Sequence, residues 1–404
     1  MNYIKWTIAL FCMIAISSQA AMPVVTNVVA SQRADTKLVD IYYDVFDDDG
    51  DTLITRVEIS DTGGNYYLVP AYSFTGDIGE GVVTGALKHI VWDAGTDWDG
   101  EYSDEMRVKI LASDTQGLPG LEWSREIPPG GFLMGQDGGV EGSGPSRHVN
   151  IPWSYWLSKY EITRQQYCDF LNAAYAAGTI YKDGTTKVYV KANAYAEVPN
   201  EEIIDIGDGE DIRWNIHRFE VTDSSQTNFP IKVNDWAGAL AFARHYGYDL
   251  STEAEWKKAH RGPDHDDAGE HLVYPWGNTI DGSNANYFNS GDPWEEDDTF
   301  SLTPVGYYNG NQIPFGLDMT NSYGMYDMAG NVAEYCRTHS VASSTIENYP
   351  QEESYIAATS YIYLGGGCRY TWSPGYRYLK CYIRDDSYGS YKGIRLIRRN
   401  IIRD

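Results

Sequence analysis

The sequence predicts an α+β protein in which an all-β N-terminal region precedes a larger region with little regular secondary structure. Up to about residue 115, apolar and polar residues alternate between turn-forming clusters, which is typical of half-buried strands. Beyond about residue 127, helical periodicity is confined to short stretches, and long segments rich in Gly, Asn and Tyr separate them. With 404 residues, 42% of them apolar, the chain has enough material for two packed cores.

Residues 1–20 have the pattern of a secretory signal peptide. Lys5 precedes an apolar run at residues 6–16, and small residues follow at Ser18 and Ala20. The apolar run is too short to span a bilayer. We therefore expect cleavage near Ala20, no membrane span in the mature chain, and a secreted, periplasmic or extracellular location.

Charge and cysteine content restrict the partners and covalent bonds of the mature chain. The net charge is -26, and it becomes -27 without residues 1–20 because Lys5 is their only charged residue. Nucleic acid and anionic membranes are therefore not expected partners.

Four cysteines remain in the mature chain. Outside the cytoplasm an even number of cysteines favours two disulfides, with three possible connectivities. The cysteines of the mature chain are Cys168, Cys336, Cys368 and Cys381. We expect Cys336 to pair with Cys368 or with Cys381.

Residues 21–115 are predicted to form a β-sandwich of immunoglobulin-like or fibronectin-like architecture. Strand patterns at residues 39–45 and 107–112 are separated by turn clusters at the spacing expected of a sandwich. The acidic turn from Asp47 to Asp51 has two open explanations, a calcium-binding oxygen cage or a solvated turn. A linker at residues 116–126 is expected to leave the next domain some freedom.

Helix starts can be identified in the C-terminal region. Thr163 with Gln166, and Thr252 with Glu255, form capping boxes ahead of residues whose spacing builds an apolar helical face. Asn234 is the expected N-cap of another helix between these two. The small number of such elements implies that loops, disulfides or ions hold much of this region together.

Residues 321–335, NSYGMYDMAGNVAEY, fit neither a helix nor a strand. Each apolar residue is followed by one suited to positive φ or to side-chain-to-backbone hydrogen bonds. We interpret the stretch as a buried, ordered loop whose carbonyl groups need partners. Two explanations stay open on these residues alone: Asx turns without an ion, or a hard cation held by Asp327, by Asn331 or a neighbouring carbonyl, and by backbone oxygens.

Seven separated motifs occur in one order: GGFLMG, YEITRQQY, LSTEAEW, YPWGN, GMYDMAGNVAEY, a glycine run followed by YRY, and GIRL. Together, over roughly residues 126–400, they resemble the sulfatase-modifying-factor family, whose founding activity is that of the formylglycine-generating enzyme. The resemblance implies a C-type-lectin-like domain at residues 127–400, with two helices, short sheets and little other regular structure.

The resemblance also implies structural Ca²⁺, bound through oxygen atoms. In the central loop it assigns the side chain of Asp327 as a ligand, and it places a glutamate ligand before the first helix at Glu161. A second ion would be bound near the YPWGN motif. The implied positions are Glu161, Asp327 and the carbonyl groups of Met328, Gly330 and Val332, and for the second ion Asn286, the carbonyl group of Tyr287, and Asp297 or Asp298, where loop length leaves the register open.

The two cysteines through which oxidases of this family bind Cu(I) are absent from their positions. Counting from the glycine run places the first position at Tyr370, and counting back from the YRY segment places the second at Gly375. Because soft Cu(I) requires thiolate or comparable ligands, copper is not expected. Cys368 and Cys381 lie nearby but out of register; they could form a copper pair in a rebuilt loop, a disulfide, or free thiols.

A Tyr-rich segment lies where the resemblance places the substrate groove. Its aromatic side chains, together with Arg377, offer stacking area and hydrogen bonds suited to a peptide or glycan, and core packing is the alternative. Two functions therefore stand: a secreted, non-catalytic binding protein for an extracellular peptide, protein or glycan, or a divergent formylglycine-generating oxidase acting on a cysteine of a sulfatase-type substrate. The groove residues are Trp372, Tyr376, Arg377 and Tyr378.

Overall fold

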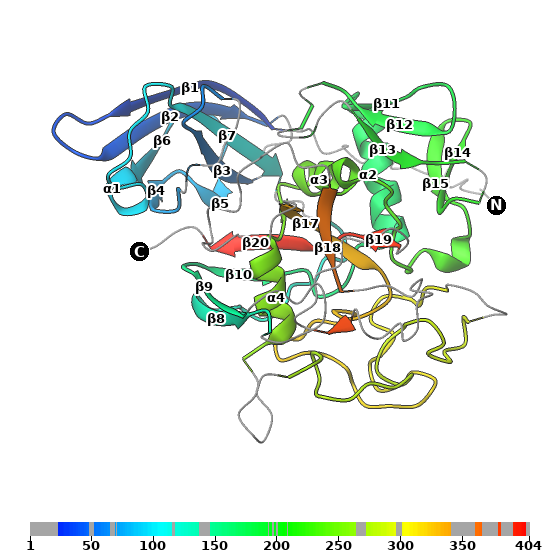
Figure 1. Ribbon diagram of the computed structural model, residues 1–404. Coiled ribbons are helices and arrows are strands. Elements are labelled where there is room, and N and C mark those ends of the chain that lie inside the picture. Colours follow the sequence, from blue (N-terminus) through cyan, green and yellow to red (C-terminus); the bar gives the residue numbers. More distant parts are fainter. Residues whose placement is uncertain are drawn as a thin grey trace, which may run out of the picture.

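The computed structural model describes residues 23–47, 52–64, 69, 71–114, 118–136, 146–192, 194–195, 198, 201–207, 209–263, 272–295, 301–340, 360–365, 379–380 and 391–400. Figure 1 shows a layered N-terminal unit beside a larger body of helices, short sheets and long loops. Within these ranges, no helix combines the length and the apolar composition that a bilayer crossing needs.

The N-terminal unit, residues 23–114, consists of two antiparallel sheets around one buried cluster. Its elements are β1 (Val24–Gln32), β2 (Leu38–Phe46), β3 (Leu53–Ser60), β4 (Phe74–Gly76), β5 (Gly79–Val82), β6 (Gly85–Asp93), α1 (Ala94–Asp97) and β7 (Arg107–Asp114). The sheet orders are β1-β2-β6-β4 and β5-β3-β7. Both sheets contribute to the cluster, for example Ile41 from β2 and Ile110 from β7. The predicted strands are present, whereas the immunoglobulin-like architecture and the domain boundary stay predictions.

In the larger body, from residue 118 onward, several small sheets surround three α-helices of the described chain. The helices are α2 (Arg164–Ala176), α3 (Trp236–His245), α4 (Glu253–Arg261) and the short 3-10 helix η1 (Ser224–Gln226). The strands are β8 (Gly130–Met134), β9 (Arg147–Ile151), β10 (Ser154–Leu157), β11 (Ile180–Lys182), β12 (Lys187–Val190), β13 (Glu202–Asp205), β14 (Ile212–Asn215), β15 (Arg218–Val221), β16 (Asp249–Leu250), β17 (Ala333–Ser340), β18 (Ser360–Leu364), β19 (Lys392–Gly393) and β20 (Leu396–Asn400). They pair as β8-β9, β10-β20-β16, β11-β12-β13, β14-β15 and β18-β17-β19.

The capping boxes predicted the starts of α2 and α4 correctly. In each, a Thr hydroxyl accepts a hydrogen bond from the third helical N–H, and the side chain of that third residue accepts one from the Thr N–H. The prediction for α3 was wrong by one residue, because Asp235 rather than Asn234 is the N-cap. The carboxylate of Asp235 accepts from the N–H two residues on, while the carbonyl of Asn234 accepts from the Tyr335 hydroxyl.

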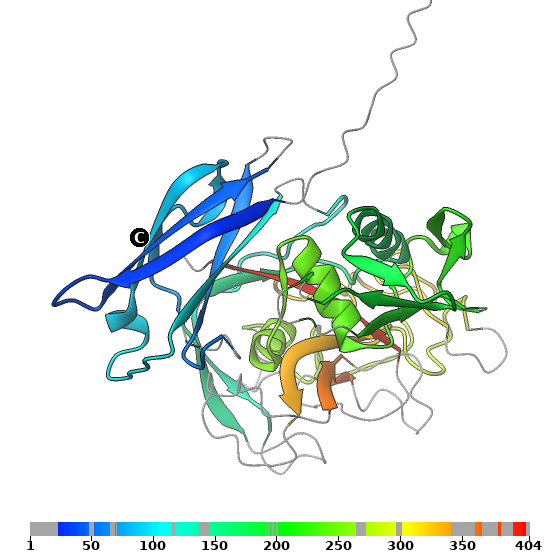
Figure 2. The same cartoon turned by 90° about the horizontal axis from the view of Figure 1, so that it is seen from above.

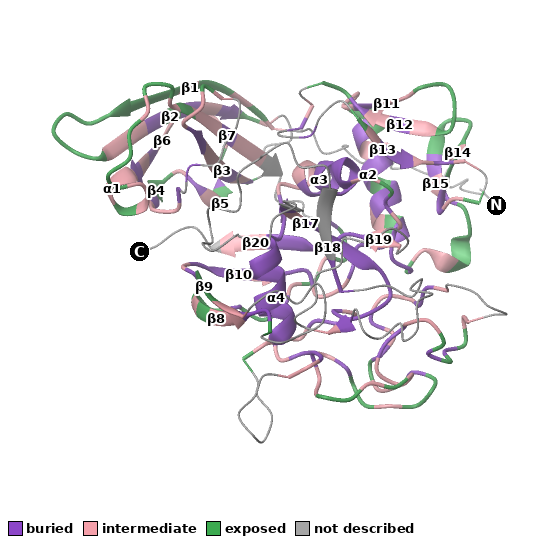
Figure 3. Cartoon of the chain, viewed as in Figure 1, coloured by how far each residue is buried: buried purple, intermediate pink, exposed green. Residues whose placement is uncertain are grey.

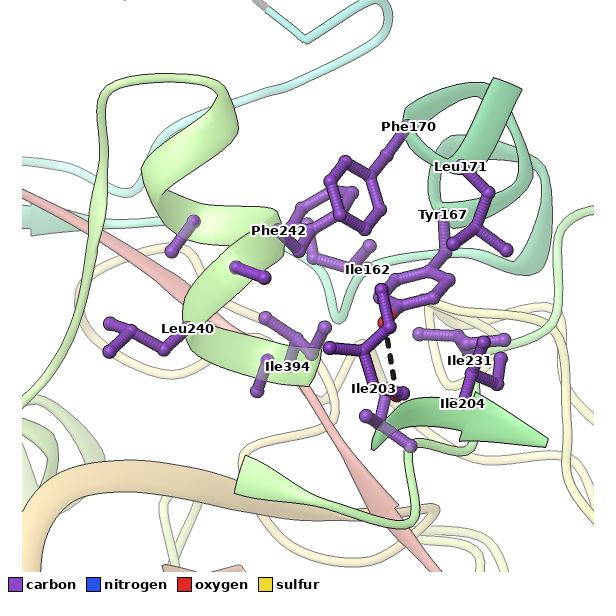
Figure 4. Packing of buried hydrophobic residues seen from close by; sticks show 14 of the residues in the cluster. Ile162, Tyr167, Phe170, Leu171, Ile203, Ile204, Ile231, Leu240, Phe242 and Ile394 are labelled. Carbon is purple, nitrogen blue, oxygen red and sulfur yellow. Dashed lines mark hydrogen bonds between the residues drawn. The ribbon is translucent and has the colours of Figure 1, made fainter. Parts of the chain in front are cut away.

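The largest buried cluster joins α2 and α3 to the strands that follow α2. Figure 4 shows Tyr167 and Phe170 of α2 directed toward Phe242 of α3, with Ile203 and Ile204 beneath them. The Tyr167 hydroxyl donates a hydrogen bond to the carbonyl oxygen of Ile203 at 3.3 Å. Seen from above in Figure 2, α2 and the hairpin β14-β15 lie at the end of the molecule farthest from the N-terminal unit.

Helix α4 is buried along its whole length, including its charged residues (Figure 3). Lys258 near its end donates to the carbonyl oxygens of Pro128 and Gly130, at 2.6 and 2.9 Å. This helix therefore anchors the start of β8. It also lies against the loop that precedes β17, where the sequence predicts the metal site.

Ionic and aromatic contacts join the N-terminal unit to the larger body. The guanidinium of Arg244, in the last turn of α3, lies 3.2 Å from Glu58 of β3 and 3.5 Å from Asp249. The rings of Tyr72 and Trp153 are 4.3 Å apart. All three members of the ionic group are nearly buried. These contacts contradict the expected freedom between the two units.

Candidate metal centre

Asn321 fixes the first half of the central loop. Its Oδ1 accepts hydrogen bonds from the N–H groups of Tyr323 and Met325, both at 3.1 Å. Its Nδ2 donates to the carbonyl oxygen of Ala259 in α4 at 2.9 Å. The stretch therefore contains an Asx turn, as in one of the two explanations left open by the sequence, and hydrogen bonding links that turn to a buried helix.

Positive φ angles shape the second half of the loop. Asp327 and Asn331 have φ angles of 55° and 58°, and Gly330 has 102°. A Cβ at Gly330 would lie 2.3 Å from the carbonyl oxygen of Asn286, so only glycine permits this close approach. The loop ends earlier than predicted, because β17 begins at Ala333 and continues through the last residues of the motif.

The side-chain amide of Asn331 joins three segments of the chain. Its Nδ2 donates to Oε2 of Glu161 at 2.8 Å. Its Oδ1 accepts from the N–H of Thr303 at 3.0 Å and from Nδ2 of Asn286 at 3.2 Å. The backbone N–H of Asn331 also donates to the carbonyl oxygen of Asn286 at 2.9 Å. The side-chain amide of Asn331 thus connects Glu161, a predicted ligand of the first ion, with Asn286, a predicted ligand of the second.

Two buried oxygen atoms beside this amide have no hydrogen-bond partner in the described part of the chain. They are Oδ1 of Asn286 and Oγ1 of Thr303, and both side chains are fully buried. An unsatisfied buried polar atom destabilises a fold, so such an atom is rare without a reason. An oxygen left free in this way is a suitable ligand for a hard cation.

Glu334 and Arg395 form a buried ion pair next to the loop. Nη2 of Arg395 lies 2.7 Å from Oε1 of Glu334, and the guanidinium also donates to the carbonyl oxygens of Ser158 and Tyr326. The indole N–H of Trp256 in α4 donates to the other oxygen of Glu334 at 2.5 Å. Arg395 is therefore already neutralised by Glu334.

Glu161 and Asp327 add two more carboxylates to this region. Glu161, which is 1% exposed, accepts from Asn331 and from the N–H of Val332 at 3.2 Å, and Asp327 accepts from the N–H of Gly306 at 2.5 Å. Burial, followed by the negative charge of Asp327, raises the pKa of Glu161 well above its usual range. Burial also raises the pKa of Asp327 to about 6. Ionising both groups is unfavourable unless a cation lies beside them.

The structure brings most of the predicted metal ligands together. Glu161, Asn286, Gly330 and Val332 are joined through the hydrogen bonds and the close approach described above, and Asp327 lies close enough to Glu161 to affect its charge. Met328 and Tyr287 are their chain neighbours. No cluster of three or more His, Cys, Asp or Glu side chains suited to a metal occurs in the described ranges. Besides the carboxylates of Glu161 and Asp327, the predicted set therefore depends on amide and carbonyl oxygens and on Asp297 or Asp298, which lie outside the described residues.

Several predicted residues lie outside the described residues. Among them are most of the acidic turn of the N-terminal unit and the remaining candidates for the metal, copper and groove sites. They are residues 48–51, Asp297, Asp298, Cys368, Tyr370, Trp372, Gly375, Tyr376, Arg377, Tyr378 and Cys381.

The predicted disulfide of Cys336 was wrong. Cys336 and Cys168 are both free and buried. Cys336 points into the core beside Leu364, and its sulfur lies 4.0 Å from the carbonyl oxygen of Glu334. Burial raises the pKa of both thiols, to about 12 for Cys168, so both are held in the unreactive protonated form.

Glu334 and Arg395 belong to this site, but neither was predicted from the sequence. A signal was available, because the first lies in the motif GMYDMAGNVAEY and the second in GIRL. Their partnership could not be deduced, since 61 residues separate them.

The fold and the site define a loop-rich α+β domain organised around an asparagine-centred loop and a group of buried carboxylates. The chain belongs to the family of the sulfatase-modifying factor enzyme 1-like domain, whose model matches residues 122–400. The family predicted from the motifs is therefore confirmed.

Its relatives include proteins named as formylglycine-generating enzymes and proteins named as inactive. The formylglycine-generating enzyme of Mus musculus is 26% identical over 318 residues, which cover 73% of this chain and 79% of that protein. The inactive C-alpha-formylglycine-generating enzyme 2 of Mus musculus is 26% identical over 258 residues, covering 58% and 73%. The solved structure of PvdO from Pseudomonas aeruginosa aligns with a TM-score of 0.41 at 16% identity, covering 68% of this chain and 92% of that one.

Proposed function

We propose that this protein is a secreted, non-catalytic family member that binds an extracellular peptide, protein or glycan on a calcium-stabilised scaffold. The observation that carries the proposal is that Tyr370 and Gly375 occupy the positions of the two copper-binding cysteines. The phenol of Tyr370 and the hydrogen atom that is the side chain of Gly375 cannot replace two thiolates as ligands for Cu(I). Secretion rests on the signal-peptide pattern of residues 1–20, and binding rests on the aromatic segment around Trp372.

The charge balance of the site supports calcium. Among the described residues, Glu161, Asp327 and Glu334 interact with one guanidinium, that of Arg395. One divalent cation would offset the two remaining negative charges, and all the donors are oxygen atoms, as Ca²⁺ prefers. Asp327 with the carbonyl groups of Met328, Gly330 and Val332 would hold one ion, with Glu161 beside them.

The unpartnered Oδ1 of Asn286 supports a second ion. Asn286 would hold this ion together with the carbonyl group of Tyr287 and with Asp297 or Asp298. The amide of Asn286 has one orientation in this network, because its Nδ2 donates to Ser301 and to Asn331. Its oxygen is therefore left for another ligand.

We also infer that the N-terminal unit is an immunoglobulin-like or fibronectin-like module. Its two antiparallel sheets share one core, and its buried and exposed residues alternate along β2. Such a module would act as a spacer or as a second binding surface, which suits an extracellular binding protein.

Calcium-dependent unfolding tests the scaffold. Since an ion that binds only the native state stabilises it, a calcium concentration 100 times the dissociation constant should add about 2.7 kcal/mol to the free energy of unfolding. We expect Ca²⁺ to raise the Tm of the EDTA-treated protein. Asp327→Asn should reduce that rise, and Asp104→Asn, at an exposed position of the N-terminal unit, should leave it unchanged. Equal Tm values with EDTA and with Ca²⁺ would exclude a structural calcium ion.

Mass spectrometry tests the loss of catalysis and decides between the proposal and the divergent oxidase. The purified protein is incubated with copper, oxygen and a sulfatase-type cysteine peptide, and the peptide is examined for conversion of its thiol to an aldehyde. We expect no conversion. Conversion that Cys368→Ser abolishes and Tyr370→Phe leaves intact would establish the oxidase instead.

A further inference from the structure

A prominent apolar surface that the proposed function does not explain is the tip formed by residues 313–317. Ile313, Phe315 and Leu317 occupy alternate positions and are 62%, 83% and 77% exposed. No charged residue occurs between Gly310 and Leu317. Single exposed apolar residues are common on protein surfaces, but three within five residues form a patch, and such patches mark interaction sites.

Hydrogen bonds from beneath hold this tip in one conformation. The side chain of Gln312 is 1% exposed, and its Nε2 donates to the carbonyl oxygens of Ser283 and Leu317 at 2.8 and 2.7 Å. The hydroxyl of Tyr307 accepts from the N–H of Ile313 at 2.7 Å and donates to its carbonyl oxygen at 3.3 Å. The backbone that presents the apolar side chains is therefore preorganised, which lowers the entropic cost of binding.

The same hydrogen bonds pair part of the backbone of the tip. The backbone polar groups of Ile313 and the carbonyl group of Leu317 are already paired within the protein. Pro314, between them, has no N–H group. Backbone groups that enter an apolar environment must be paired internally, so this arrangement lowers the cost of moving the tip into such an environment.

The size and charge of the patch favour a lipid surface over a protein. Three such side chains offer roughly 400 Å² of apolar surface. A stable protein interface needs about 800 Å² on each partner and a complementary surface, whereas a small group of exposed apolar side chains can enter lipid without one. The net charge of -26 opposes anionic lipids and is compatible with zwitterionic ones.

We propose that residues 313–317 insert into the boundary between headgroups and acyl chains of zwitterionic membranes and hold the protein at a lipid surface. This contact is peripheral and goes beyond the proposed ligand binding and calcium scaffold. Figures 1 and 2 show the loops of residues 301–318, in yellow, on the side of the larger body away from the N-terminal unit. The N-terminal unit would therefore point away from the membrane.

Co-flotation with phosphatidylcholine vesicles tests the proposal. We expect the wild-type chain to float with the vesicles, at low and at high salt alike, because apolar insertion is not screened. Phe315→Ser should weaken partitioning by about tenfold, which is the effect of losing one buried aromatic side chain. The triple variant Ile313→Ser, Phe315→Ser, Leu317→Ser should not float, and its Tm should match that of the wild type because the three side chains are exposed.

A matched control is Leu87→Ser with Ile216→Ser, which removes two equally exposed apolar residues located outside the tip. This variant should float like the wild type. Wild-type protein that stays with the unbound fraction would overturn the proposal, and so would flotation that requires anionic lipid or persists in the triple variant. Sedimentation of the lipid-free protein tests self-association: a dimer that the triple variant loses would assign the tip to contact with a second copy.

Discussion

Asn331 shows how one amide can determine the geometry of the candidate centre. Its hydrogen bonds with Glu161, Thr303 and Asn286 use both its donor and acceptor atoms, and it adopts a left-handed φ of 58°. Asparagine tolerates that φ better than most residues. Because Asn331 uses Nδ2 of Asn286, it also orients the amide whose oxygen is unpartnered. Asn331 is thus a positioning residue for both predicted ion sites.

Replacement of Asn331 should therefore be costly without altering any proposed side-chain ligand. We expect Asn331→Ala to lower the free energy of unfolding by roughly 3 kcal/mol, because it leaves several buried polar groups without partners. Urea unfolding measures this loss. The control Asn215→Ala removes an exposed asparagine bonded to Glu220 and should cost less than about 0.5 kcal/mol. A cost for Asn331→Ala as small as that of the control would contradict the positioning role.

His260 is a buried residue with an expected effect on pH dependence. It is 1% exposed, packs 4.5 Å from Trp256, and neither ring nitrogen has a hydrogen-bond partner in the described structure. Burial, reinforced by the charges of Arg261 and Lys257, lowers the pKa of His260 well below its usual value. The native state therefore keeps this imidazole neutral at a pH at which the unfolded chain binds a proton.

The contribution of His260 to the stability should fall as the pH falls below about 6.5, the pKa of an unfolded histidine. Because the unfolded chain binds one more proton than the native state, the unfolding free energy changes by about 1.4 kcal/mol per pH unit. We expect His260→Leu to remove that contribution, so the difference in unfolding free energy between variant and wild type should grow from pH 7 to pH 5. A difference that stays constant over this range would contradict the assignment.

The elements that the sequence predicted correctly are those whose signals are local. Thr163 and Thr252 start helices because each side chain bonds to a backbone group only three residues away. Asn234 and Asp235 are both good caps, and Asp235 is the one used, while the carbonyl group of Asn234 accepts a hydrogen bond from Tyr335, far away in the sequence. The free state of Cys336 and the ion pair of Arg395 likewise depend on tertiary packing. Local patterns contain no information about such contacts.

Two glycines of the central loop allow its geometry to be tested. Gly324 and Gly330 both have positive φ, at 80° and 102°, but only Gly330 is crowded. We expect Gly324→Ala to cost about 1 kcal/mol, the strain of a left-handed alanine. Gly330→Ala should cost at least about 3 kcal/mol, since it also forces the carbonyl of Asn286 away. Chemical denaturation gives both values, and equal costs would show that close approach does not shape this loop.

At the scale of the molecule, a buried charge cluster connects the two units. Asp249, 2% exposed, lies 2.6 Å from Nη1 of Arg337 and 2.8 Å from Nη1 of Arg399, with Arg244 also nearby. Burial opposes ionisation of Asp249, but the surrounding guanidinium groups outweigh it and hold its pKa well below its usual range. Arg56, from the N-terminal unit, belongs to the same cluster, and burial lowers its pKa to about 10.

Asp249→Asn should therefore weaken the attachment of the N-terminal unit. The variant leaves several buried guanidinium groups with one carboxylate fewer, and breaking a buried pair in this way costs about 3 to 5 kcal/mol. We expect calorimetry of the variant to resolve two transitions where the wild type shows one, because the energetic link between the units is lost. Limited proteolysis should then cleave the segment between residues 115 and 126.

Asp211→Asn is the matched control for this prediction. Asp211 is also buried and forms ion pairs with Arg164 and Lys232, but all three residues lie within the larger body. Asp211→Asn should lower the Tm, but calorimetry should still show one unfolding transition, because the contacts between the two units remain. If Asp249→Asn also unfolds in one transition at a lower Tm, the cluster stabilises the larger body alone. The units would then be held together by contacts such as Tyr72 with Trp153.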